Sequence, residues 1–308
     1  MHRQNISKAL LSQCLLAALI STAGAASALA ATPLHFPALV QPASNEHHAG
    51  KVILVELVTP DIAASKQFYS GLFNWAFDDI QSGDAHYAAA SLDGRPVAGL
   101  IQKSVKAGEQ RQPAWLTFIS VRDVDAARAA AAQHGAKVLF EPHTLADRGR
   151  EAVFADPQGA VFAVLASSSG DPPDELAAPG EWIWSSLITS DPDKDAAFYQ
   201  ALTDYEVFDI TDADGPQEHL QLASDNYARA SVNSFPLNRP DMHAHWLNFV
   251  RVDDVAKASA KVTALGGRVI VEPREDRHGG KIAVVADPQG AHFGLMEWSD
   301  ADSKQVTK

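Results

Sequence analysis

Hydrophobic and polar positions follow one local order that recurs along the chain. At residues 54–73 an alternating apolar run (LVELVT) is followed by an Asp and then by apolar residues at helical spacing. Residues 116–135 repeat this order, with an Ala-rich helical stretch that stops at a Gly. A period of two is typical of a strand and a period near 3.6 of a helix. Asp61 and Asp123 stand where an N-cap or first-turn acid satisfies free helix amides.

Short strand-like runs follow each predicted helix. Examples are residues 86–92, 137–142, 151–156 and 160–166. Each quarter of the chain is therefore predicted to be a βαβββ unit, and each half to hold two such units. Because the helices share one side of the sheet, its other face is free to curl into a cup. The pattern predicts an α+β fold with a curved sheet in each half and helices on the outer face of that sheet.

One sequence segment appears twice in the chain with some changes. "VFADPQGAVFAVL" covers residues 153–165 and "VVADPQGAHFGLM" covers residues 284–296, so 131 positions separate Asp156 from Asp287. Trp115 and Trp246 keep the same offset. Colinear matches of this kind indicate a tandem duplication. We expect one domain at 51–166, a second at 181–298, and a Pro-, Gly- and Ser-rich linker at 167–180.

The first 30 residues have the features of a secretory signal peptide: a basic start, an apolar run and a small-residue cleavage site at 28–30. An uncleaved membrane anchor is the alternative, although polar residues interrupt the apolar run. Cleavage would remove Cys14, the only cysteine in the sequence. The mature chain is then expected to be periplasmic or secreted and free of the membrane, with an extended leader at 31–50 and a C-terminal tail at 299–308.

The amino-acid composition indicates only the general class of protein. With 46% hydrophobic and 20% charged residues, the chain is typical of soluble globular proteins. The net charge of −13 argues against a nucleic-acid partner, because such a surface needs clustered Lys and Arg. The sequence shows no nucleophile–base motif, Gly-rich phosphate loop or nucleotide fingerprint.

Taken together, the paired units, the D-x-x-x-S/A-x-x-F-Y and W-L-x-F-x-x-V-x-D-V patterns and the closing A-D-P-Q-G-A-x-F resemble the vicinal oxygen chelate superfamily. This superfamily includes glyoxalase I, extradiol dioxygenases and bleomycin-resistance proteins. The resemblance covers about residues 51–166 and 181–298. Within the superfamily, these sequence patterns are most similar to those of a tandem glyoxalase-like subgroup whose members are labelled hydroxylase-like or secreted antigen. One fold hosts many chemistries in this superfamily, so the resemblance is specific for fold and weak for function.

The resemblance also implies where a metal would be held. Enzymes of the superfamily use His and Glu on the leading and last strands of the units to hold a divalent metal in the cup. Carried over, the ligand positions are Leu54, Leu116, Ala163, Trp184, Leu247 and Gly294. None of these residue types binds a metal. No metal is therefore expected at the superfamily's own positions.

Other side chains are candidates for lining the cups. Positions two residues from a ligand position share its face of the strand. The candidate ligand-binding residues are Glu56, His86, Arg150, Ser186, His219, His245, Lys281 and His292. Each also has a plain structural explanation, such as a rim carboxylate, a strand-start histidine or a solvated charge. A divalent metal held by His219, His245 and His292 is an alternative that requires three strands to converge. Trp115 and Trp246 are expected to point away from the cups and to pack in a core or interface.

The expected function is binding of a small organic molecule in one or both cups, without a cofactor. The resemblance supports this, because metal-free superfamily members include proteins that trap a drug between subunits. Two alternatives stay open: a metal-dependent lyase, dioxygenase or hydroxylase-like enzyme with rearranged ligands, and an interaction module whose cups are vestigial. Bound metal would favour the enzyme, and cups filled by the chain's own side chains would favour the interaction module. Self-association is a further partner option.

Overall fold

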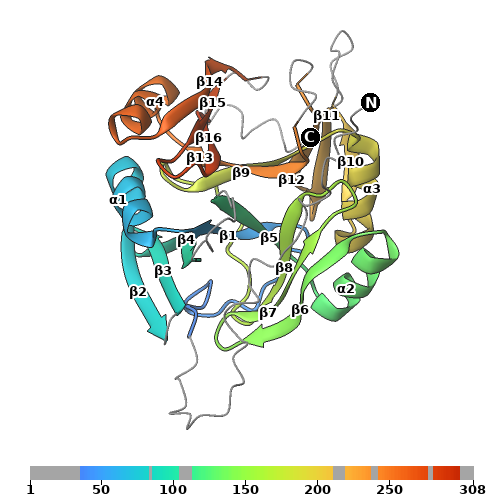
Figure 1. The fold of residues 1–308 in the computed structure, drawn as a ribbon. Coiled ribbons are helices and arrows are strands. Elements are labelled where there is room, and N and C mark those ends of the chain that lie inside the picture. Colours follow the sequence, from blue (N-terminus) through green and yellow to red (C-terminus); the bar gives the residue numbers. More distant parts are fainter. Residues whose placement is uncertain are drawn as a thin grey trace, which may run out of the picture.

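The structure, a computed structural model, describes residues 35–82, 85–103, 113–210, 219–236, 242–276 and 280–298. The predicted signal peptide and C-terminal tail lie outside these residues. Four βαβββ units follow one another, as the sequence predicted (Figure 1). The first domain contains β1 (Val52–Thr59), α1 (Ile62–Phe73), β2 (Ala76–Ser82), β3 (Ala85–Leu92), β4 (Arg95–Gln102), β5 (Ala114–Ser120), α2 (Val124–Gln133), β6 (Lys137–Leu145), β7 (Gly149–Ala155) and β8 (Val161–Ser167). The second contains β9 (Trp182–Thr189), α3 (Pro192–Thr203), β10 (Glu206–Asp209), β11 (His219–Ser224), β12 (Tyr227–Ser234), β13 (His245–Arg251), α4 (Val255–Ala264), β14 (Arg268–Glu275), β15 (Lys281–Ala286) and β16 (His292–Met296).

Each domain forms one curved sheet of eight strands. The order in the first sheet is β2-β3-β4-β1-β5-β8-β7-β6, and the second sheet has the equivalent order β10-β11-β12-β9-β13-β16-β15-β14. The two units of a domain meet through antiparallel pairing of β1 with β5, and of β9 with β13. The α+β fold of tandem domains predicted from the repeat is confirmed.

Local sequence explains where the helices begin. The side chain of Asp61 accepts a hydrogen bond from the amide of Ala64, and Asp123 accepts from two amides of the next turn. Asp191 and Asp254 cap α3 and α4 in the same way. These carboxylates satisfy amide groups that the helix leaves free at its N-terminus.

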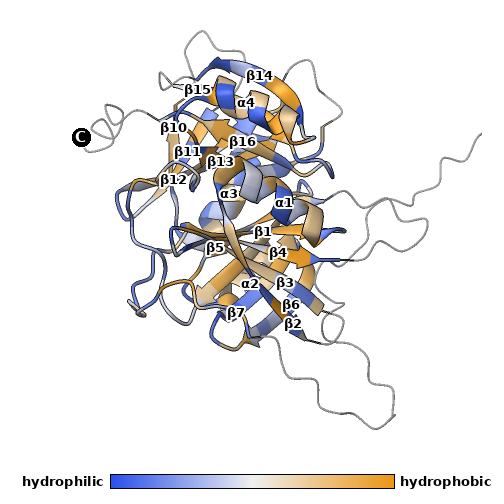
Figure 2. Cartoon of the chain, turned by 90° about the vertical axis from the view of Figure 1, so that its left-hand side faces the viewer, coloured by the Kyte–Doolittle hydropathy of each residue, from blue (hydrophilic) through white to orange (hydrophobic). Residues whose placement is uncertain are grey.

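The two sheets pack back to back, with the helices at the sides of the interface. Figure 1 shows α1 beside α4 and α2 beside α3, while β5 and β13 lie against each other at the centre. Hydrophobic colouring concentrates in the central strands such as β1 and β5 (Figure 2). Trp115 and Trp246 are buried in the two clusters between the sheets, each 6% exposed. The prediction that they point away from the cups is confirmed.

The repeated Asp-Pro-Gln-Gly loops hold the two domains together. Asp156 of the first domain accepts a hydrogen bond from the Tyr199 hydroxyl of the second at 3.0 Å, and that hydroxyl accepts one from Trp246 Nε1 at 2.8 Å. The mirror contact joins Tyr69 of the first domain to Asp287 of the second at 3.1 Å. We call these two contacts the interdomain latches. The repeated phrase therefore has a structural role at the interface.

The leader and the linker are tied to each other. Asp171 in the linker accepts hydrogen bonds from Ser120 Oγ at 2.6 Å and from the His48 amide at 2.7 Å. Asp174 accepts from Lys51 Nζ at 2.7 Å and from Arg229 at 2.6 Å. Within the described ranges, no helix is long and apolar enough to cross a membrane.

Candidate functional site

The concave faces of the two sheets, called cup 1 and cup 2 for the first and second domain, open on opposite sides of the molecule (Figure 1). A cluster of buried side chains on the first face includes Tyr87, Leu116 and Phe118. A smaller cluster on the second face includes Leu247, Phe249 and Met296. The two faces differ in what covers them and in the polar groups they hold.

Cup 1 holds a buried polar triad on its floor. Glu56 Oε1 accepts hydrogen bonds from Tyr87 Oη at 2.9 Å and from Arg148 Nη1 at 2.8 Å. Arg148 Nη2 also donates to Tyr87 Oη at 2.8 Å. All three side chains are 1–2% exposed. Gly99 makes this approach feasible, because a Cβ there would lie 2.2 Å from the tyrosine hydroxyl and 2.7 Å from the carboxylate.

The triad is a buried ion pair with opposing electrostatic effects. Burial raises the pKa of Glu56, while the positive charge of Arg148 pulls that pKa down. The guanidinium needs its partner, because an unpaired buried cation is far more costly than a solvated one. The sequence pointed to Glu56 as a pocket residue, but Tyr87 and Arg148 were missed.

A second carboxylate lies beside this triad. Glu151 of β7 is 1% exposed, and its charge affects both Glu56 and Arg148. Its Oε1 is 3.3 Å from Nε2 of His143, but Oε2 has no hydrogen-bond partner. Buried polar atoms normally have a partner, so this oxygen is an open acceptor on the cup 1 face.

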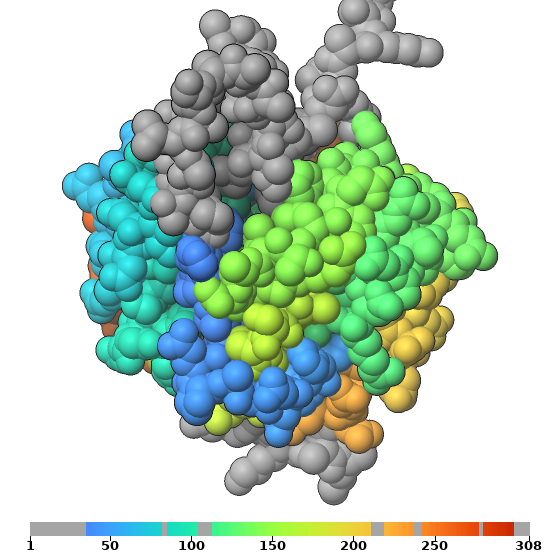
Figure 3. All heavy atoms as spheres, turned by 90° about the horizontal axis from the view of Figure 1, so that it is seen from below, coloured from blue at the N-terminus to red at the C-terminus, as the bar shows by residue number. Residues whose placement is uncertain are grey.

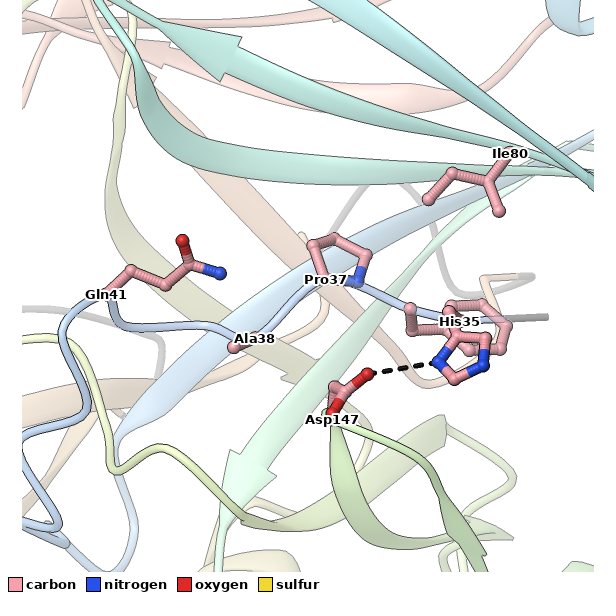
Figure 4. Close-up of a pocket in the computed structure, with 7 residues that line it drawn as sticks. His35, Pro37, Ala38, Gln41, Ile80 and Asp147 are labelled. Atoms are coloured by element: carbon pink, nitrogen blue, oxygen red, sulfur yellow. Dashed lines mark hydrogen bonds and ion pairs between the residues drawn. The ribbon is translucent and has the colours of Figure 1, made fainter.

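The mouth of cup 1 is filled by the chain's own leader. Residues 35–42, which we call the N-terminal plug, place Phe36 and Leu39 in the cup 1 cluster with exposures of 7% and 9%. The Phe36 ring packs edge-on against Tyr87 at 4.9 Å, and the Arg148 guanidinium lies 5.0 Å from its centre. Seen from below, the leader lies across the face between the β2–β4 and β6–β8 halves of the sheet (Figure 3). A hollow of about 330 Å³ remains beside the plug, where His35 reaches Asp147 (Figure 4).

Cup 2 has a different lining. Partly exposed Ile183, Trp184, Ile188, Val284 and Trp298 pack on its buried cluster. The described part of the leader contributes nothing to this cluster. Cup 2 therefore presents an apolar and aromatic surface that is only partly buried.

A serine pair on the floor of cup 2 has a favoured proton direction. Ser231 Oγ accepts hydrogen bonds from Trp184 Nε1 at 3.0 Å and from Asn233 Nδ2 at 3.2 Å. Ser231 Oγ and Ser186 Oγ lie 2.8 Å apart, and either hydroxyl can be the donor. Because Ser231 Oγ already accepts two hydrogen bonds and has two acceptor sites, donation from Ser231 to Ser186 is the favoured direction. The proton of Ser186 is then left to point elsewhere. Ser186 stands at the repeat position of Glu56 and is 6% exposed.

His245 supplies an acceptor on the same face. Its Nδ1 lies 2.8 Å from the carbonyl oxygen of His243 and donates to it. Burial lowers the pKa of His245, which favours the neutral ring. In that tautomer Nε2 carries the lone pair. The antiparallel register puts His245 opposite Ile188, two positions along β9 from Ser186, so the two candidates are diagonal neighbours.

Several sequence candidates lie elsewhere. The sequence comparison treated His86 and His219 as equivalent positions of the two repeats, and this alignment is wrong by one residue. The strand register makes Tyr87 the equivalent of His219. His86 therefore lies on the opposite face of its strand from Tyr87. A one-residue slip moves a side chain to the other face of a strand. Arg150 is partly exposed and pairs with Asp125 of α2 at 2.8 Å, away from the cup. Lys281 alternates with Ile282 of the cup 2 cluster and so lies on the helix side too.

The three-histidine metal hypothesis meets a geometric obstacle. His219 and His245 share a row of the sheet, but β12 and β9 lie between their strands, a separation of about 14 Å at ordinary strand spacing. His292 is exposed at the start of β16. The described ranges contain no group of three His, Cys, Asp or Glu side chains that could hold a metal ion. Convergence of the three strands, which the hypothesis required, is not found there.

Comparison with known proteins places this architecture. The sequence model of the Glyoxalase/Bleomycin resistance protein/Dioxygenase superfamily matches residues 47–164 and, separately, 183–295. The chain belongs to this superfamily. CFP32 of Mycobacterium tuberculosis (strain CDC 1551 / Oshkosh), named as a candidate glyoxylase, is 32% identical over 83% of this chain and 98% of its own. The anthracycline biosynthesis protein DauV of Streptomyces sp. (strain C5) is 30% identical over 80% of this chain and 92% of its own.

Solved structures of the superfamily share the fold. The Mn(II)-bound glyoxalase from Novosphingobium aromaticivorans aligns with a TM-score of 0.56 at 18% identity, covering 82% of this chain and 83% of that one. The 2,3-dioxygenase LapB from Pseudomonas sp. KL28 aligns with a TM-score of 0.58 at 12% identity, covering 82% and 93%. At these identities the likeness concerns the fold alone.

The residues at the superfamily's metal positions do not fit a metal. Leu54, Leu116 and Ala163 belong to or pack on the cup 1 cluster, and Trp184 and Leu247 to the cup 2 cluster. At Gly294 an added Cβ would lie 2.0 Å from the ring of Phe249, so an aromatic side chain takes the space of a ligand. None of these side chains offers an oxygen, nitrogen or sulfur donor of the kind that binds a divalent metal.

Proposed function

We propose that this superfamily member binds a small aromatic molecule in cup 2 without a metal. The observation that carries the proposal is the donor left over at Ser186. The two donors on Ser231 favour donation of its own proton to Ser186, which leaves the Ser186 proton for an oxygen acceptor on a ligand. An apolar pocket with a few directed polar groups is the usual form of a small-molecule site.

The lining favours a flat, aromatic ligand. Trp184 and Trp298, both partly exposed, pack on the cluster that contains Phe249. The neutral ring of His245 adds an acceptor, so a ligand with both a carbonyl oxygen and a hydroxyl would be matched at two points. The name of the DauV relative, an anthracycline biosynthesis protein, is consistent with polycyclic aromatic compounds of this kind.

Binding of 1,4-dihydroxyanthraquinone tests the proposal. Titration should quench tryptophan fluorescence, and treatment with EDTA should not change the affinity. Ser186→Ala should weaken binding about fivefold to tenfold, the effect of losing one net hydrogen bond of roughly 1 kcal/mol. Ser185→Ala is the matched control, because that hydroxyl points to Asn248 at the domain interface, 2.6 Å away.

Two results would count against this function. Equal affinities of the unmodified chain and Ser186→Ala would show that the Ser186 hydroxyl does not donate a hydrogen bond to the ligand. Binding or turnover that appears only after a divalent metal is added would favour the metal-dependent enzyme instead.

We also propose that the protein is exported after cleavage following Ala30. The support is the sequence of residues 1–30 alone. N-terminal sequencing of protein recovered from outside the cytoplasm should begin at Ala31. If the protein is instead recovered from a membrane fraction and its sequence begins at Met1, the uncleaved membrane anchor is supported.

A further inference from the structure

The N-terminal plug is attached to cup 1 more loosely than the chain that follows it. Residues 44–50 are fixed by backbone hydrogen bonds, including Ser44 to Ser169 at 3.0 Å and Gly50 to Ser120 at 2.8 Å. The plug is not a strand, and no backbone-to-backbone bond joins its described residues to the sheet. Its backbone is held by two bonds to side chains: Val40 N to Ser169 Oγ at 3.1 Å, and Arg148 Nε to the Pro37 carbonyl at 3.4 Å.

The contacts of the plug are those that a small ligand would make. An aromatic ring, that of Phe36, contacts both the Tyr87 ring and the Arg148 guanidinium. A carbonyl oxygen, that of Pro37, accepts from Arg148. The guanidinium is held by Glu56 and Tyr87, neither of which belongs to the plug, so the donor would keep its position if the plug left. Such preorganisation favours ligand binding.

A buried carboxylate on the cup 1 face keeps one oxygen without a hydrogen-bond partner while the plug is in place. Glu151 Oε2 is buried and accepts no hydrogen bond. The plug has a carbonyl for Arg148 but gives this oxygen no donor. A molecule with an aromatic ring, a carbonyl and an N–H group could use all of these features. The hollow beside the plug is lined mostly by residues of the plug itself, together with Ile80 and Asp147 (Figure 4). Departure of the plug would therefore open it further.

We propose that residues 35–42 are a displaceable occupant of cup 1, which competes with small aromatic amides for the Tyr87–Arg148 site. With the plug in place, cup 1 is closed. When it leaves, the aromatic amide takes the positions of the Phe36 ring and the Pro37 carbonyl. This inference depends only on cup 1, so its test is independent of the proposed function of cup 2.

The test uses the full chain and a labelled peptide, acetyl-HFPALVQP-amide, which copies residues 35–42. Phe36→Ala with Leu39→Ala should weaken the built-in competitor. The double variant should then bind the peptide at least tenfold more tightly than the unmodified chain, as measured by fluorescence anisotropy. A peptide with Phe replaced by Ala should not bind, and N-acetyl-phenylalaninamide should displace the natural peptide. Arg148→Met added to the double variant should abolish binding.

A matched control and a second measurement keep the test decisive. Ile270→Ala with Val271→Ala removes exposed apolar side chains from β14 of the other domain and should leave peptide binding at the unmodified level. In the unmodified chain, amides of the plug should exchange with deuterium at least tenfold faster than those of residues 44–50. Equal peptide affinity of the double variant and the unmodified chain, or slow exchange throughout the plug, would overturn the inference.

Discussion

Asp195, in the first turns of α3, is a buried carboxylate at the domain interface. It is 0% exposed, and neither of its oxygens has a hydrogen-bond partner of good geometry. Burial raises its pKa to about 7, the nearby charges of Asp156 and Asp191 add to the rise, and the Thr189 hydroxyl offsets only part of it. In the first repeat the equivalent residue is Ser65, whose hydroxyl lies 3.0 Å from Thr59 Oγ1 and 2.9 Å from Gln289 Nε2.

The raised pKa makes the stability of the fold depend on pH at this position. The unfolded chain releases the Asp195 proton near pH 4, whereas the folded chain keeps it until about pH 7. Stability from this group is therefore fully present below the unfolded pKa and falls as the pH rises from about 4 to about 7. At about 1.4 kcal/mol per pKa unit, a difference of about three units is worth at most about 4 kcal/mol.

Asp195→Asn keeps the shape and removes the charge. Its gain in unfolding free energy over the unmodified chain should grow by about 2 kcal/mol between pH 5 and pH 8. Urea unfolding at pH 5, 6, 7 and 8 measures this difference. Asp193→Asn, an exposed acid in the same turn, is the control and should show no comparable growth. A gain for Asp195→Asn that is the same at pH 5 and pH 8 would refute the reasoning.

Two further predictions concern buried hydrogen bonds. Glu56→Gln should cost about 3 kcal/mol of unfolding free energy, because Arg148 becomes an unpaired buried cation. Adding Arg148→Met should recover part of this loss in a double-mutant cycle. If the free-energy changes of the two single variants simply add, the ion pair does not act as described. Tyr199→Phe breaks one interdomain latch and should cost roughly 1–3 kcal/mol, whereas Tyr227→Phe, exposed at 48%, should cost almost nothing in the same denaturation assay.

The fold could be predicted from the sequence because its signals are local and repeated. Strand and helix periods, the capping Asp residues and the duplicated phrase each depend on neighbours in the chain. The alternation of side chains between the two faces of a strand correctly placed Leu54 and Trp184 on the cup faces and Trp115 away from them.

The candidate site was harder to predict because its contacts are distant in sequence. Arg148 lies in a turn and becomes important only through Phe36, which is 112 positions earlier, and through Glu56. The repeat comparison favoured Arg150 instead, because Lys281 stands at its equivalent position. Similar runs of letters likewise aligned His86 with His219, whereas the register of hydrogen bonds decides which face a side chain occupies.

The interdomain latches have a consequence for the origin of the two cups. Each latch joins a tyrosine of one copy to the loop of the other, so two separate identical domains could form the same pair of contacts around a twofold axis. In such a homodimer both copies would carry the same substitutions. Fusion into one chain removes that constraint, and a change that closes one cup no longer closes the other. Glu56 beneath a plug and Ser186 beneath a partly exposed aromatic surface are what that freedom allows.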